Sequence, residues 1–427
     1  MSDKLELPKS WEIAKLGQLW NTTSGGTPSR KEMHYFQGNI PWVKSGELEH
    51  NVIVNTEEKI TEEALKNSSA KIFPKGTLLI ALYGATIGKL AFLGIDASSN
   101  QAVCGIYTNQ HLSSHFLYYF LFFKRPNLVK ESIGGAQPNI SQGILKNLDV
   151  PLPPLPEQHR IVEKIEALFS ELDNGVEQLK TAQQQLKVYR QSVLKWAFEG
   201  KQKVTWNKLV LNEICDQTRG ITYGVIKLGK YVQNGIPCLR TSDVRFLKIE
   251  TDNVKKISDN ISNNFKRTIL QGGEILVNVR GTLGGVAVVP DKFKSWNISR
   301  EVAMVPITKD INEYFIAYQI ASIKSQNWLN KVTKGIAYAG INLSDLRNLP
   351  ITLPLLEEQH QIVQEIETRL SVCDKLEETI TASLQQAEAL RQSILKKAFE
   401  GKLVPQNPND EPASVLLERI REEKKEK

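Results

Sequence analysis

The sequence contains one long internal repeat, whose two copies lie 201 residues apart. Residues 157–201 align with residues 358–402 without a gap, and 22 of the 45 aligned positions are identical. An ungapped repeat of this length predicts two structural units with one architecture. A solenoid is excluded, because solenoids need short periods and at least three copies. Two copies indicate instead that one chain imitates a two-fold symmetric pair.

Both copies have the spacing of a long amphipathic helix. Apolar residues recur in alternating steps of three and four, a pattern that requires a partner helix. Pro156 or Pro354, followed by acidic residues, opens each helix, and Gly200 or Gly401 suits the position after its last turn. Each predicted helix has about 44 residues, or roughly 66 Å. The predicted seam consists of Ile165, Leu168, Leu172, Leu179, Leu186 and Val193 in the first copy, and Ile366, Leu376, Ile380, Leu390 and Ile394 in the second.

Gly175 interrupts the first seam. Glycine in a helix interior costs about 1 kcal/mol relative to alanine. A close approach of two backbones would explain why it is present. His159 and His360 lie in the first turn of the two helices, and their repetition predicts a contact at the helix entry rather than catalysis.

The repeats divide the chain into five segments. Residues 1–150 and 203–350 form two heads, residues 151–202 and 351–403 form two helical spacers, and residues 404–427 form a tail expected near the first head. Short β-branched runs between Gly, Pro and Asn make both heads strand-rich. If a pseudo-dyad relates the halves, the helices run antiparallel. The expected fold class is therefore α+β, with two strand-rich domains separated by two long helices that form an antiparallel coiled coil.

Positive charge is concentrated in the second head. The chain carries a net charge of +7, but residues 203–350 carry 21 basic and 12 acidic side chains, or +9. Residues 1–150 carry 15 basic and 13 acidic side chains, a net charge of +2. A basic domain of this size fits a polyanion such as double-stranded DNA. The alternative is an ordinary solvated surface that happens to be basic.

The heads share short segments that supply candidate DNA contacts. Ile40–Leu48 parallels Ile236–Val244, and the segment after Gly76 parallels the segment after Gly273. Polar and basic side chains in such loops can contact phosphates or base edges. The alternative is that matching residues maintain the shared fold, while bases are contacted by residues that differ. The candidates are Lys44, Ser45, Tyr83, Thr86, Lys89, Asn100, Gln101, Gln137 and Asn139 in the first head, and Arg240, Thr241, Arg280, Thr282, Arg300, Tyr338 and Asn342 in the second.

Signals for other chemistry are weak. The segment Gly84–Leu90 resembles a phosphate loop, but it has three residues between its glycines instead of four, and Leu90 replaces the residue that would bind magnesium. A tight turn beside a strand explains it better. His111 and His115 have i, i+4 spacing without a nearby third metal ligand. We therefore expect no catalytic residue, no metal and no cofactor on this chain.

The pattern of cysteines and the hydropathy of the sequence indicate where in the cell the protein is located. The four cysteines are scattered, which favours reduced thiols over a disulfide framework. The N-terminus lacks the apolar core of a signal peptide, and no apolar run reaches the ~18 residues of a membrane span. A cytoplasmic protein is expected.

Ordered motifs over essentially the whole chain resemble one family. Pro151–Gln158 and Leu353–Gln359 are similar to its junctions between head and helix, and Leu194–Lys201 and Leu395–Lys402 resemble its helix ends. The closing segment Leu403–Ile420 and the opening segment Leu7–Glu12 also fit. Each motif is modest alone, but the set is specific. The chain resembles the specificity (S) subunit of Type I restriction–modification systems.

This resemblance implies a non-catalytic subunit of a restriction endonuclease and adenine-N6 DNA methyltransferase complex. Each head would be a target recognition domain that reads one half of a split, asymmetric DNA sequence, and the coiled coil would fix the gap. Two modification subunits, which bind S-adenosylmethionine, would dock on the helices and heads. Two restriction subunits, which bind ATP and Mg, would complete the nuclease.

Two other functions remain open. The chain could serve as the DNA-reading partner of a methyltransferase outside a restriction complex, as in an orphan modification or phage-defence system. It could also be a coiled-coil scaffold that binds only proteins. The charge of +9 on the second head argues against the scaffold, because such a surface favours polyanions.

Overall fold

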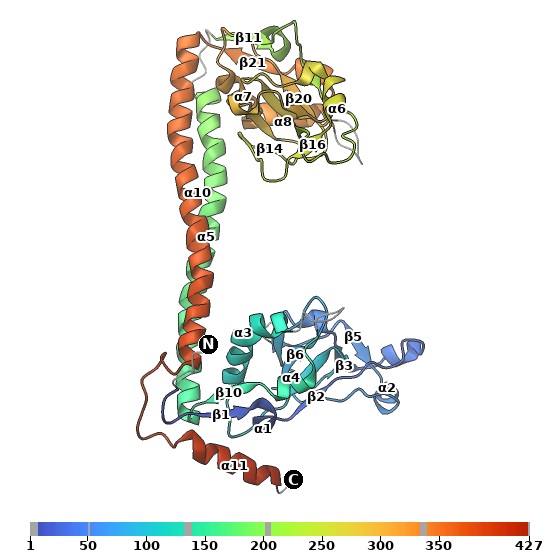
Figure 1. The fold of residues 1–427 in the computed structure, drawn as a ribbon, viewed down its shortest axis with the longest axis vertical. Helices are drawn as coiled ribbons and strands as arrows, with labels where there is room; N and C mark the ends of the chain where they lie inside the picture. The colour runs from blue at the N-terminus through green and yellow to red at the C-terminus, as the bar shows by residue number, and fades with distance from the viewer. Residues whose placement is uncertain (1–6, 50–51, 132–138, 201–205, 334–339, 426–427) are drawn as a thin grey trace. The chain divides into compact units, whose positions relative to one another are not determined.

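The computed structural model divides into two compact units, the first of which combines the two ends of the chain. Unit 1 combines Met1–Gln178 with Ser383–Lys427, and unit 2 is Leu179–Ala382. The structure describes residues 7–49, 52–131, 139–200, 206–333 and 340–425. Figure 1 shows a strand-rich body and part of both long helices in each unit. The α+β class is confirmed. The boundaries between the two units fall inside both long helices. The predicted division into two heads, two spacers and a tail follows other boundaries and stays a prediction.

Unit 1 has a five-stranded sheet of order β2-β9-β6-β7-β4, a three-stranded sheet of order β5-β3-β8, and the pair β1-β10. All residues of the central strands β6 and β9 are buried, which explains why both sequences are continuously apolar. The strands are β1 (Glu12–Lys15), β2 (Thr22–Ser24), β3 (Ile40–Val43), β4 (Val52–Ile53), β5 (Glu58–Ile60), β6 (Leu78–Ala81), β7 (Leu90–Leu93), β8 (Ser98–Ser99), β9 (Val103–Ile106) and β10 (Asp149–Leu152). The head helices are α1 (Leu16–Leu19), α2 (Glu62–Lys66), α3 (Ser114–Glu131) and α4 (Gln142–Lys146).

Unit 2 has a four-stranded sheet of order β12-β20-β17-β18, a three-stranded sheet of order β16-β13-β19, and the pairs β14-β15 and β11-β21. Its strands are β11 (Asn207–Val210), β12 (Thr222–Tyr223), β13 (Ile236–Leu239), β14 (Val244–Arg245), β15 (Lys248–Ile249), β16 (Lys255–Ile257), β17 (Ile275–Asn278), β18 (Val286–Val288), β19 (Asn297–Ile298), β20 (Val302–Val305) and β21 (Pro350–Leu353). Its head helices are α6 (Asp259–Asn263), α7 (Glu313–Ala321), α8 (Ile323–Val332) and α9 (Leu343–Arg347).

The two heads share one topology. In unit 1, β3 pairs antiparallel with β5 and parallel with β8. In unit 2, β13 pairs antiparallel with β16 and parallel with β19. Likewise β6 lies between β7 and β9, and β17 lies between β18 and β20, all antiparallel. The internal repeat therefore extends from the helices into the sheets, where few residues are identical.

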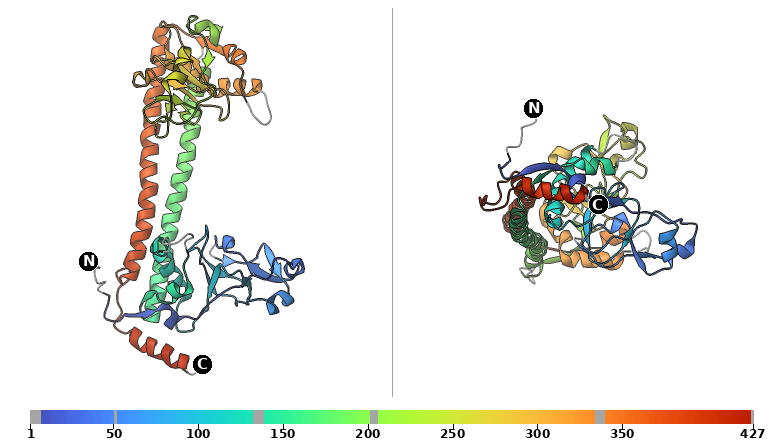
Figure 2. Two further views of the ribbon diagram at one scale, coloured as in Figure 1. Left: turned by 45° about the vertical axis from the view of Figure 1, so that its right-hand side comes forward. Right: turned by 90° about the horizontal axis from the view of Figure 1, so that it is seen from below.

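The long helices are α5 (Leu155–Lys195) and α10 (Leu356–Phe399). A short π-helical turn follows α5 at Trp196–Gly200. In unit 1 the first half of α5 packs on the last half of α10, and Ile165 and Ile394 share one core. In unit 2 the last half of α5 packs on the first half of α10, where Val193 and Ile366 share another. Within each unit the helices run side by side in opposite directions (Figures 1 and 2).

Part of the predicted seam is buried. Ile165, Val193, Ile366, Ile380 and Ile394 are buried. Two predicted seam residues, Leu376 and Leu390, are instead 47% and 52% exposed. A single partner helix covers only part of a side chain, so these leucines lie at the margin of the seam. The remaining predicted seam residues are half-buried: Leu168, Leu172, Leu179 and Leu186.

The close approach suggested for Gly175 is wrong. A Cβ built at this glycine meets no atom within 4 Å, and its φ is not in the left-handed region. We therefore expect Gly175→Ala to raise the free energy of unfolding by about 1 kcal/mol, because alanine loses less conformational entropy in a helix. Denaturant titration followed by circular dichroism would measure the change. An unchanged or lower stability would contradict the open packing at this position.

The entry of each long helix is fixed by a buried glutamine. Gln158 Oε1 accepts a hydrogen bond from the Ser113 backbone N–H at 2.9 Å, and its Nε2 donates to the Pro153 carbonyl at 2.9 Å. Gln359 makes the equivalent bonds to Asn312 and Pro354, also at 2.9 Å. These bonds tie α3 to α5 and α7 to α10. The neighbouring histidines, predicted to make this contact, are exposed instead.

The C-terminal helix α11 (Ala413–Lys425) packs on unit 1. Its apolar face, formed by Ala413, Leu416, Leu417 and Ile420, joins the core that contains Leu16 and Trp20. His111 Nε2 lies 2.6 Å from Glu423 Oε1 on this helix. None of the helices in the described part of the chain is long and apolar enough to cross a membrane.

Candidate nucleic-acid interface

In unit 2, buried Asn278 at the end of β17 joins two of the predicted segments. Its Nδ2 donates to the carbonyls of Thr241 at 3.2 Å, Val244 at 3.0 Å and Thr282 at 3.0 Å. The loop after β13, which begins at Arg240, is therefore fixed against the hairpin between β17 and β18. Sequence reasoning missed Asn278. The available signal was a polar residue ending an otherwise apolar strand.

Two further segments join the same edge through backbone hydrogen bonds. The N–H groups of Val279 and Arg280 donate to the Glu301 carbonyl at 2.9 and 3.2 Å, and Ile341 N–H donates to the Val279 carbonyl at 2.8 Å. Arg280 also forms an isolated antiparallel bridge with Gly340. We call the segments 240–244, 279–285, 298–301 and 340–342 loop cluster 2. It brings together Arg240, Thr241, Arg280, Thr282, Arg300 and Asn342.

The basic side chains of loop cluster 2 differ in how freely they can bind a ligand. Arg240 Nε and Nη2 each donate to the buried Asp243 carboxylate at 3.2 Å, and Nη2 also donates to the Asn253 carbonyl at 2.8 Å. Arg280 and Arg300 are exposed. Among the described residues, neither has a carboxylate within ion-pair distance. These two arginines are therefore available to an anion, whereas Arg240 is held by its own loop.

Unit 1 has an equivalent cluster. Leu82 N–H donates to the Ala102 carbonyl at 2.7 Å, Ile140 N–H donates to the Leu82 carbonyl at 2.7 Å, and Tyr83 bridges Asn139. Asn100 N–H donates to the Val43 carbonyl at 2.9 Å. We call the segments 43–48, 81–89, 98–102 and 139–140 loop cluster 1. It brings together Lys44, Ser45, Tyr83, Thr86, Lys89, Asn100, Gln101 and Asn139.

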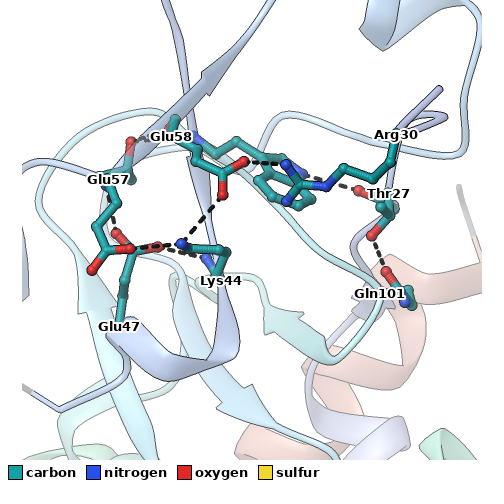
Figure 3. A network of polar contacts seen from close by, with 10 residues as sticks. Thr27, Arg30, Lys44, Glu47, Glu57, Glu58 and Gln101 are labelled. Atoms are coloured by element: carbon teal, nitrogen blue, oxygen red, sulfur yellow. Dashed lines mark hydrogen bonds and ion pairs between the residues drawn. The ribbon is translucent and has the colours of Figure 1, made fainter. Parts of the chain in front are cut away.

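The cations of loop cluster 1 are already neutralised, as Figure 3 shows for Lys44. Its Nζ lies 2.6 Å from Glu57 Oε2 and 3.2 Å from Glu58 Oε1. The hydrogen bond to Glu57 raises the pKa of Lys44. Lys89 Nζ lies 2.9 Å from Glu49 Oε1. Any anion must compete with these carboxylates, so the cluster offers polar groups more readily than positive charge.

A basic residue outside the predicted set belongs to this network. Arg30 Nη1 lies 2.6 Å from Glu58 Oε2 and its guanidinium stacks 4.1 Å from the Phe36 ring centroid. Its hydrogen bond lowers the pKa of Glu58. Gln101 accepts a hydrogen bond from the Thr27 hydroxyl in the same region (Figure 3). Two other candidates, Gln137 and Tyr338, lie outside the described residues.

The segments weighed for other chemistry have structural explanations. Gly84 and Gly88 have φ values of 84° and 72° in the β6–β7 hairpin, and Gly88 N–H donates to the Ala81 carbonyl at 2.8 Å. This confirms a tight turn beside a strand. His115 stacks on Phe92, with ring centroids 4.8 Å apart. The described residues contain no group of three or more His, Cys, Asp or Glu side chains that could hold a metal ion.

Comparison with known proteins agrees over both halves of the chain. The model of the Type I restriction modification DNA specificity domain matches residues 8–181 and 203–386. The Type I restriction enzyme EcoBI specificity subunit of Escherichia coli is 29% identical and covers 98% of this chain and 94% of its own length. The EcoKI specificity subunit of Escherichia coli (strain K12) is 26% identical, over 98% of this chain and 96% of the relative.

Solved structures show the same fold. One chain of a type I R-M system superposes with a TM-score of 0.73 at 21% identity and covers 93% of this chain and 100% of that chain. The HsdS subunit from Thermoanaerobacter tengcongensis superposes with a TM-score of 0.57 at 22% identity, over 94% of this chain and 100% of its own. With the domain matched twice and the architecture shared, this chain belongs to the family of type I restriction–modification specificity subunits.

Proposed function

We propose that this chain selects the DNA target of a Type I restriction–modification complex, with each head reading one half of a bipartite asymmetric sequence. As a specificity subunit it is a non-catalytic component. The proposal rests on one observation: the two heads share a topology, yet loop clusters 1 and 2 carry different side chains at equivalent strand ends. A common scaffold with different contact residues is what two different half-sites require.

We infer the assembly from the family, whose membership supports the following partners. Modification subunits that bind S-adenosylmethionine dock on this chain and methylate adenine in the selected target. Restriction subunits that bind ATP and Mg complete the nuclease. Two copies of each partner are proposed because the chain is itself a duplicated structure. The family membership supports the kinds of partner, and the internal repeat supports their number.

The gap between the half-sites is proposed to depend on the length of α5 and α10. Inserting four residues into both helices should lengthen the spacer by roughly 6 Å, at 1.5 Å per residue. Because one base pair advances DNA by about 3.4 Å, the preferred gap should grow by a base pair or two. Methylation mapping of the variant complex would show this. A matched control inserts four residues between exposed Pro408 and Asn409. An unchanged gap in the helix variant would contradict the spacer role.

A further inference from the structure

In unit 2 the loop between β12 and β13 extends from loop cluster 2 to the neighbouring sheet. It begins beside the cluster, because Val225 N–H donates to the Ile298 carbonyl at 2.8 Å and Arg300 N–H donates to the Val225 carbonyl at 2.9 Å. It ends beside β16, where Val232 N–H donates to the Lys256 carbonyl at 3.2 Å. Backbone hydrogen bonds therefore fix this loop near both of its ends.

The exposed side chains of this loop are basic and aromatic. Residues 225–238 contain no Asp or Glu, and Lys227, Lys230 and Tyr231 are exposed. Half-buried Lys255 on β16 places its Nζ 5.9 Å from the Tyr231 ring centroid, within cation–π distance. Among the described residues, none of these three lysines has a carboxylate within ion-pair distance. We call Lys227, Lys230, Tyr231 and Lys255 the basic ridge.

Unit 1 has the opposite charge at the equivalent position of the same strand pair. In unit 2, Lys255 of β16 lies opposite Cys238 of β13. In unit 1, Glu58 of β5 lies opposite Trp42 of β3, in the same antiparallel register. Glu58 neutralises two cations of its own head, whereas Lys255 neutralises no carboxylate among the described residues. Because the same strand pair forms with either charge, the shared fold does not explain the lysine.

The basic ridge lies at the same edge of unit 2 as loop cluster 2. Arg240 Nη2 donates to the carbonyl of Asn253, two residues before Lys255, and the exposed Arg300 is bonded to the start of the ridge loop. Duplex DNA carries one negative charge per about 1.7 Å of its axis. A duplex bound at loop cluster 2 therefore presents further phosphates to the surface beside it, where the lysines are unpaired.

We propose that the basic ridge binds the phosphate backbone of duplex DNA beside the half-site that loop cluster 2 reads. The inference rests on the function proposed above for the nature of the ligand. The ridge holds the DNA without selecting its sequence, because contacts to phosphates fix the position of a duplex and carry no base information. The first head has Glu58 at the equivalent position, so this contact belongs to the second head.

The test uses the full chain in complex with its modification subunit and two labelled duplexes, one with the methylated target and one of unrelated sequence. We expect Lys227→Gln/Lys230→Gln/Lys255→Gln to weaken binding of both duplexes by at least about tenfold. The salt slope should fall by about 2 to 3, since each lost phosphate contact removes roughly 0.9. Lys255→Glu alone, which copies the charge of Glu58, should also weaken both. Methylation mapping should return the wild-type motif for each variant.

The matched control, Lys292→Gln/Lys294→Gln/Lys309→Gln, removes the same charge from the same head. These exposed lysines follow β18 and β20, at the strand ends opposite loop cluster 2, so the affinity should change less. Circular dichroism should show wild-type secondary structure in all variants. Wild-type affinity and salt slope in the ridge variant would overturn the proposal, and a changed motif would too, because it would show that the ridge reads bases. The motif made by the wild-type complex tests the proposed function separately, because it does not depend on these substitutions.

Discussion

Reversing the charge of Arg280 and Arg300 together is expected to weaken DNA binding by at least about tenfold and to lower the salt slope by about 2. Each phosphate contact contributes roughly 0.9 to the slope of log K against log salt concentration. Both side chains are exposed in loop cluster 2, with no carboxylate partner among the described residues. Fluorescence anisotropy of Arg280→Glu/Arg300→Glu in the complex, measured with labelled duplex at several salt concentrations, would give both quantities.

The control places the same charge change at the opposite ends of the same strands. Lys292 follows β18 and Lys309 follows β20, whereas loop cluster 2 precedes both strands. Lys292→Glu/Lys309→Glu should therefore change the affinity less than the arginine variant. If the arginine variant binds at low salt with wild-type affinity, Arg280 and Arg300 do not contact DNA.

Replacing the buried glutamines at the helix entries is expected to cause the largest loss of stability. Gln158→Leu removes two hydrogen bonds and leaves the Ser113 N–H and the Pro153 carbonyl without their partner. An unsatisfied buried polar group costs about 1–3 kcal/mol, so the two groups together should cost unit 1 about 2–6 kcal/mol. Gln359→Leu should destabilise unit 2 in the same way. Denaturant unfolding followed by tryptophan fluorescence would measure both, since each unit contains tryptophan.

Gln184→Leu is the matched control, because Gln184 lies exposed on the same helix. Exposed substitutions usually change stability by no more than about 0.5 kcal/mol. Equal stabilities for Gln158→Leu and Gln184→Leu would show that the buried glutamine does not hold the head to the helix.

The helices were predictable because they depend on periodic apolar residues, which one sequence displays directly. Their antiparallel pairing was predicted from the pseudo-dyad that two copies imply. The shared head topology was also predictable, since Ile40–Leu48 and Ile236–Val244 keep similar strands. The interactions of the loop residues could not be predicted from the sequence. Whether Arg240 is free depends on Asp243 folding back onto it, and Lys44 is neutralised by Glu57, 13 positions further along the chain. Residue type alone does not reveal such partners.

Two further contacts were not predicted, because they also depend on residues that are distant in the sequence. Asn278 holds three carbonyls that come from segments up to 37 residues away, and no local pattern marks such a contact. The sequence predicts a repeated contact at the helix entries and assigns it to His159 and His360, each of which directly follows a glutamine. Burial decides the matter: Gln158 and Gln359 are 0% and 2% exposed. The sequence pattern located the repeated contact within one residue, and only the packing identified the side chain that makes it.

The neutralised cations of loop cluster 1 and the free arginines of loop cluster 2 agree with the charges of +2 and +9 on the two heads. Under the proposed function, the second head supplies more of the phosphate contacts, and the first depends more on hydrogen bonds to bases. The half-site that the first head reads should therefore lose less affinity than the other as the salt concentration rises.

The most direct measurement is a genome-wide map of methylated adenines made by this chain with its modification subunit and S-adenosylmethionine. We expect one bipartite asymmetric motif with a fixed gap, because two different heads are joined by a spacer of set length. A single contiguous motif would contradict the account, since it would show that only one head reads DNA.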